Sequence, residues 1–220
     1  MFNPYAQSGW ANAANPNAGS SGTVPQPSIF GALPYASPRN PPPTFVPFRI
    51  TSSSPSPTTT SSSSSSSNTT PEILDSTVTG PPHHSRTYFR VRTDAPTVGF
   101  TVIHNSATKE PVGVIEWRKH PVIEIRNILP KQPTGKWLEL SADRTYRTMT
   151  ARGKTFVWAP DGNYICLYAP GLNAPETYAR VSREESGSIL LELTPEAIQL
   201  GLLEVAVAAA LLLQCGRKVD

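Results

Sequence analysis

Short runs in which apolar and polar residues alternate dominate the chain from Thr87 onward, and a period of two is typical of half-buried β-strands. In residues 88–92, Phe89 and Val91 fall on one face and two arginines fall on the other. Further runs of this kind are 99–104, 112–117, 122–126, 136–141, 146–150, 154–158, 164–168, 176–182 and 188–193. The connections between these runs are too short to join parallel strands. The pattern predicts a mostly β domain, an antiparallel barrel or sandwich of about ten short strands.

A helix is predicted over residues 195–215, where the period of the pattern changes. Thr194, Pro195 and Glu196 supply an N-cap hydroxyl, a proline at the first helical position and a carboxylate in the first turn. Apolar side chains surround this helix in nearly every direction, which indicates that it is buried in a core or lies in a membrane. In the first case the strands lie around it or against it.

Two explanations of the apolar helix stay open. The 17 residues from Ala197 to Leu213 reach the lower limit for crossing a bilayer, so the helix could anchor the protein in a membrane. Gln199 and Glu204 interrupt the apolar run, and a central acid costs about 2.5–3.5 kcal/mol on insertion. We therefore favour a helix in the core of the domain.

The first 84 residues differ in composition from the rest. Residues 51–70 are almost wholly Ser, Thr and Pro, and such a segment cannot bury enough apolar surface to offset its ordering entropy. We predict a disordered Pro/Ser/Thr-rich tail over 1–84 and a single β domain over 85–220. The tail is a tether, or it regulates the domain. Regulation is favoured by four candidate phosphorylation sites that precede prolines, Ser37, Ser54, Ser56 and Thr70. The apolar segment 28–35 is a candidate docking motif.

The charge and the cysteine content argue against a nucleic-acid-binding domain and against a disulfide-rich secreted protein. The net charge of +3 is mildly basic and falls short of a dedicated nucleic-acid-binding domain. The two cysteines are too few for a disulfide framework, and residues 1–5 do not resemble a signal peptide. We expect an intracellular, cytoplasmic protein, with membrane association as the alternative.

Sequence motifs for catalysis or cofactor binding are missing. The four histidines are not spaced as metal ligands, and neither a G-x-S-x-G turn nor a phosphate-binding glycine loop occurs. Cys166 falls within a predicted strand, where a packed thiol is the usual explanation. We therefore expect no catalytic residues, no cofactor and no metal, and predict that the protein is not an enzyme.

One basic cluster is a candidate ligand site. Four cations fall within eleven residues that contain no acid, across a predicted hairpin: Arg144, Arg147, Arg152 and Lys154. Such a cluster can bind anionic phosphate groups through charge-assisted hydrogen bonds, although a solvated basic strand face explains it equally well. Arg86, Arg90 and Arg92 form a second cluster.

Several segments together resemble a known family. Residues 114–117 (Val-Ile-Glu-Trp), 154–158 followed by Asp161-Gly162, 189–193 before the helix and tail residues 29–34 resemble a domain family of unknown function, numbered six-five-nine-three and common in mushroom-forming fungi. The resemblance covers residues 86–216 and implies no catalytic residues. Strands around an apolar C-terminal helix also resemble the tubby-like barrel, which occurs in phosphoinositide-binding and scramblase-like proteins. None of the phosphoinositide-ligand motifs of those proteins maps onto this sequence, so the second resemblance implies a fold only.

Three functions remain as hypotheses. The best interpretation is a non-enzymatic interaction or ligand-binding module with an unidentified protein partner. The alternative is a membrane-associated protein that binds anionic phospholipid through the basic hairpin or is anchored by its last helix. The third is an enzyme with an unrecognised site.

Overall fold

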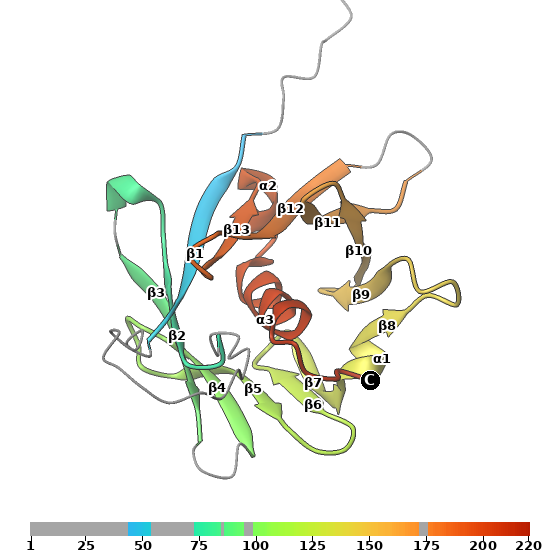
Figure 1. Ribbon diagram of the computed structural model, residues 1–220, viewed down its shortest axis with the longest axis horizontal. Helices are drawn as coiled ribbons and strands as arrows, with labels where there is room; N and C mark the ends of the chain where they lie inside the picture. Colours follow the sequence, from blue (N-terminus) through green and yellow to red (C-terminus); the bar gives the residue numbers. More distant parts are fainter. Residues whose placement is uncertain (1–43, 54–72, 85, 95–98, 172–175) are drawn as a thin grey trace, which may run out of the picture. The chain divides into compact units, whose positions relative to one another are not determined.

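The computed structural model describes residues 44–53, 73–84, 86–94, 99–171 and 176–220, and these form one β domain (Figure 1). Its strands are β1 (Val46–Ser52), β2 (Ser76–Thr79), β3 (Thr87–Thr93), β4 (Phe100–Asn105), β5 (Pro111–Glu116), β6 (Val122–Ile125), β7 (Leu129–Pro133), β8 (Leu138–Leu140), β9 (Arg147–Ala151), β10 (Lys154–Asp161), β11 (Tyr164–Ala169), β12 (Glu176–Arg183) and β13 (Ile189–Leu193). The helical elements are η2 (Pro82–His84), α1 (Thr134–Trp137), α2 (Pro195–Gln199) and α3 (Leu203–Gln214).

The thirteen strands found among the described residues join into one antiparallel sheet, which confirms the predicted fold class. Their order in the sheet is β7-β6-β5-β4-β3-β2-β1-β13-β12-β11-β10-β9-β8. Neighbours in sequence are neighbours in the sheet except β7 and β8, which form its two ends, and β1 pairs in addition with β13. The sheet is therefore a meander whose first and last strands meet in its middle.

The predicted boundary between tail and domain needs correction, because β1 and β2 lie within the 84 residues predicted to be disordered. Phe48 and Ile50 of β1 alternate with Arg49 and Thr51, and the first pair is buried. Phe48 lies opposite Leu191 of β13, so this short strand is held by a partner that is distant in sequence. The prediction was based on the Ser/Thr/Pro content of residues 1–84 as a whole, so it overlooked the alternation within β1.

The other predictions about the tail concern residues outside the described part of the chain. They concern the apolar segment 28–35 and the four candidate phosphorylation sites, Ser37, Ser54, Ser56 and Thr70.

Helix α3 lies in the middle of the domain with strands around it (Figure 1). Eight successive residues, from Val205 to Leu212, are buried, so every side of the helix is covered. Inward-facing side chains such as Ile50, Ile115 and Leu167 belong to the same core. Of the two explanations for the apolar helix, the structure thus shows a core helix. Among the helices in the described part of the chain, none is long and apolar enough to cross a membrane.

The predicted helix over 195–215 is in fact two helices. Thr194 is the N-cap of α2, and its side chain accepts a hydrogen bond from the Ala197 amide at 3.2 Å, as the sequence indicated. Helix α2 then ends because Gly201 adopts a left-handed conformation with a φ of 68°. The chain turns there before α3 begins, which a continuous apolar pattern did not reveal.

The last two residues, Val219 and Asp220, which we call the strap, cover the region between β7 and β8, the two outermost strands of the sheet. The chain end lies beside α1, the turn that connects these strands (Figure 1). The buried Thr134 hydroxyl donates a hydrogen bond to the Val219 carbonyl oxygen. Asp220 accepts two hydrogen bonds from the Arg147 guanidinium, both of 2.8 Å. The last residues therefore fix α1 against β9.

We predict that truncating a side chain of α3 lowers the free energy of unfolding more when that side chain is more deeply buried. Leu211→Ala should lower the free energy of unfolding by about 2–5 kcal/mol, because Leu211 is fully buried. Leu203→Ala is the control and should cost less, because Leu203 is only half-buried. Chemical denaturation followed by circular dichroism measures both. Equal effects would contradict a helix that is enclosed along its length.

We also predict that Gly201→Ala destabilises the domain. A left-handed backbone costs a residue with a Cβ about 1–2 kcal/mol, and the new methyl group would lie 2.8 Å from the Arg152 side chain. Gly171→Ala is a suitable control, because its Cβ meets no atom within 4 Å. Thermal unfolding should show a lower midpoint temperature for Gly201→Ala than for Gly171→Ala. A midpoint of Gly201→Ala equal to that of the wild type would contradict the prediction.

Candidate functional site

Reactive side chains inside the described domain are held in unreactive surroundings. Burial raises the pKa of the Cys166 and Cys215 thiols, so both stay protonated near neutral pH, where the thiolate is the nucleophile. Both cysteines are free. Within the described residues, His, Cys, Asp and Glu side chains form no group of three that could hold a metal ion.

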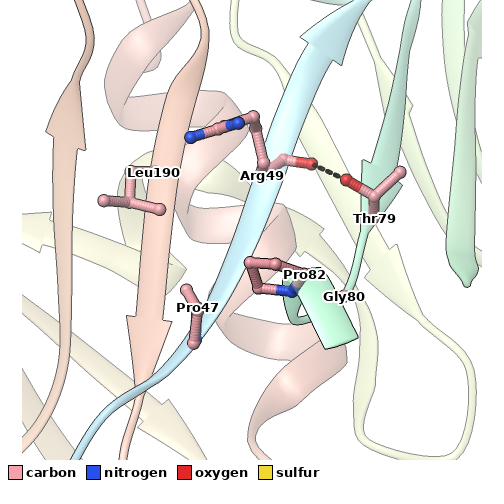
Figure 2. A pocket seen from close by; sticks show the side chains of 6 residues that line it. All are labelled: Pro47, Arg49, Thr79, Gly80, Pro82 and Leu190. Carbon is pink, nitrogen blue, oxygen red and sulfur yellow. Dashed lines mark hydrogen bonds between the residues drawn. The ribbon is translucent and has the colours of Figure 1, made fainter. Parts of the chain in front are cut away.

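One hollow of about 300 Å³ lies on the outward side of β13, β1 and β2 (Figure 2). It is lined by Pro47, Arg49, Thr79, Gly80, Pro82 and Leu190. The Arg49 guanidinium donates a hydrogen bond of 2.8 Å to Glu184, and the Thr79 hydroxyl donates a long one, 3.4 Å, to the Arg49 carbonyl oxygen. Among the described residues that line the hollow, Arg49 is the one charged residue and is already paired, which leaves a mainly apolar lining with little to select a ligand.

A second surface, on the outward side of β4 to β6, carries apolar side chains where a sheet normally faces water. On β4 to β6, Ile103, Ile115 and Ile123 point into the core. The alternate positions should then be polar, because the outward face of an antiparallel sheet is usually solvated. Besides the polar residues His104, Glu116 and Glu124, they hold four apolar side chains, which we call the valine face: Phe100, Val102, Val114 and Val122.

The valine face lies outside the core of the domain. Phe100 is 44% exposed, and the three valines are partly exposed without packing on the core cluster. Val102 lies directly opposite Val114 on the neighbouring strand, so the face is continuous across β4 and β5. A small hollow of about 190 Å³ adjoins it, lined by Val112, Val114, Glu124 and Arg126 among others.

Charged side chains lie beside the valine face and also within it. On β3, Arg92 lies opposite Val102 and is exposed. Within the face, Glu116 lies opposite both Phe100 and Val122, is only 8% exposed and is ion-paired with both Lys131 and Arg118. The hydrogen bond from Lys131, and then the charges of Arg118 and Lys131, lower the pKa of Glu116 against the opposing effect of desolvation.

The structure separates the four residues of the predicted basic site. Arg144 precedes β9 and Arg147 begins it, whereas Arg152 and Lys154 lie beyond its other end, about 16 Å farther along at 3.3 Å per residue. Arg147 is 15% exposed and bound to Asp220, and it also donates to the Leu138 carbonyl oxygen at 2.7 Å.

Arg152 also has a structural contact, since its Nε donates to the Gly201 carbonyl oxygen at 3.2 Å. The exposed Arg144 and Lys154 remain without an ion pair to any described residue. Anion binding by the four residues stays a prediction.

Sequence reasoning did not identify the valine face, although a signal was present. Residues 112–115 read Val-Gly-Val-Ile and 122–125 read Val-Ile-Glu-Ile, so apolar residues occupy both faces of these strands. A strand with one solvated face needs apolar residues on its buried face only, so apolar residues on both faces indicate a second apolar surface.

Comparisons with known proteins add a family but no activity. The model of DUF6593, a family of unknown function, matches residues 55–218, which include every strand except β1. The X-ray structure of a protein from Arabidopsis thaliana is similar, with 12% sequence identity and a TM-score of 0.36 over 76% of this chain and 92% of that chain. At these values the likeness carries no argument about function. No curated protein matches the sequence.

We predict a pH-dependent contribution from the ion pair between Arg147 and Asp220. The hydrogen bond from Arg147 lowers the pKa of Asp220, so the pair stabilises the fold above the unfolded-state pKa near 4 and ceases to do so as the pH falls through the lower folded value. Asp220→Asn should therefore cost up to about 1 kcal/mol at pH 7, since Asp220 is half exposed. Denaturation from pH 7 down to pH 2 measures this, and a difference that persists at pH 2 would count against the ion pair.

Proposed function

The chain belongs to DUF6593, a family of unknown function, and we propose that its β domain is a non-enzymatic interaction module that binds a partner protein through the valine face. The observation that carries this proposal is the set of four apolar side chains on the outward side of β4 to β6. Contiguous apolar surface on a folded domain commonly marks an interaction site.

The filled interior supports an outer surface as the place of binding. A barrel of about eight strands can hold a small ligand only where its lumen is empty. Here α3 occupies the middle of the sheet, and residues 205–212 are all buried. Strands arranged around a C-terminal helix also support a tubby-like barrel, as the sequence resemblance implied.

The alternative of a phospholipid-binding basic hairpin has weaker support. Arg147 and Arg152 are engaged by Asp220 and by the Gly201 carbonyl oxygen, so two of its four cations already hold the fold together. We propose a cytoplasmic protein on the grounds given by the sequence.

We predict that a double variant, Val102→Thr with Val114→Thr, loses binding to the natural partner. Threonine keeps the branched Cβ that strands favour but places a hydroxyl on the face. Full-length protein is immobilised and exposed to native cell extract, and retained proteins are compared between variants. Val157→Thr is the matched control, an outward valine on β10, away from the face.

The expected result is a protein retained by the wild type and by Val157→Thr but absent from the double variant. Thermal unfolding should show that both variants keep the wild-type fold. An identical set of retained proteins from all three would contradict the proposal.

A further inference from the structure

We infer that the segment which binds the valine face is acidic, an inference that rests on the proposed function. The charge of the chain is unevenly placed. Residues 86–133, which form β3 to β7, contain eight Arg and Lys against four Asp and Glu. Residues 134–220 contain nine against ten. The positive charge of the domain thus belongs to the half that carries the valine face.

Two arginines beside the face are free to bind a partner. Arg90 and Arg92 point outward from β3, and both are exposed. Among the described residues neither forms an ion pair, unlike Arg147. Residues i and i+2 of a strand, such as Arg90 and Arg92, are about 6.6 Å apart, and alternate side chains of an extended peptide have the same spacing. Arg92 lies opposite Val102, so one segment can reach both the arginines and the face.

On the rest of the surface around the face, the charges of six residues balance: Lys131, Arg118 and Arg126 against Glu116, Glu110 and Glu124. Glu116 is shared by Lys131 and Arg118, which leaves one positive charge in excess. Glu110 is paired with Arg126 at 3.5 Å. Glu124, on β6 beside Val114, is the acid of this surface for which we find no ion pair among the described residues. The excess positive charge beside the face therefore comes from Arg90 and Arg92, and these two arginines supply the net attraction for an acidic segment.

The shape of the face favours a protein segment over a membrane surface. The three valines are only partly exposed, and longer arginine, lysine and glutamate side chains flank them. The adjoining hollow of about 190 Å³ can receive one apolar side chain. A flat lipid surface would reach Phe100 but would not fill this hollow.

Direct binding tests the inference. The probes are a short fluorescein-labelled peptide that alternates Glu with Leu, the same peptide with Gln in place of Glu, and vesicles of three parts phosphatidylcholine to one part phosphatidylserine. The variant is Arg90→Gln with Arg92→Gln in the full chain. Its control is Arg144→Gln with Lys154→Gln, which removes the same charge from exposed residues of the predicted basic hairpin.

The acidic peptide should bind the wild type at low salt, more tightly than the Gln peptide. Affinity should fall roughly two- to fivefold for each arginine removed, and the loss should shrink at high salt. The control should bind within twofold of the wild type, and Val102→Thr with Val114→Thr should also bind weakly.

Three results would overturn the inference: no binding of the acidic peptide, equal loss in the control, or vesicle binding that needs Arg90 and Arg92 while peptide binding does not. The proposed function can survive such a failure. It stands if the extract partner is lost from the valine variant but kept by the Arg90 and Arg92 variant.

Discussion

The enclosure of α3 by the sheet is the constraint on which the rest of the structure depends. A helix whose side chains are apolar in every direction cannot be covered by packing on one side, so the strands must surround it. Residues 205–212 are buried without interruption, and small side chains such as Ala208 and Ala209 let the strands approach closely. The sheet therefore needs enough strands to go around the helix, and β1 and β2 are part of that wall.

Several polar contacts serve this enclosure. Arg152 bonds the turn at Gly201, where α2 ends and the chain enters the core. Arg147 and Thr134 hold the strap at Asp220 and Val219 across the region between β7 and β8. Basic and polar groups that look like ligand-binding residues in the sequence are thus used to keep the wall closed around the helix.

A filled interior leaves the outward side of the sheet for function. Most outward positions carry polar or paired side chains, such as Arg180, which is held by Glu192 at 2.6 Å and stacked on Tyr164. The valine face departs from this rule, and Arg90 and Arg92 next to it are unpaired among the described residues. These features are the basis for proposing that this side of the domain binds a partner.

The sequence by itself determined ten of the thirteen described strands, their antiparallel pairing and the N-cap at Thr194, because alternation and capping are local properties of the chain. Only the tertiary structure decided that residues 46–52 form a strand, because its partner β13 is distant in sequence. It also decided which arginines are ion-paired: Arg147 is neutralised by Asp220, a residue 73 positions away, while Arg90 forms no ion pair with a residue that the structure describes. The role of a charge depends on what the fold brings beside it, and a local pattern does not contain that information.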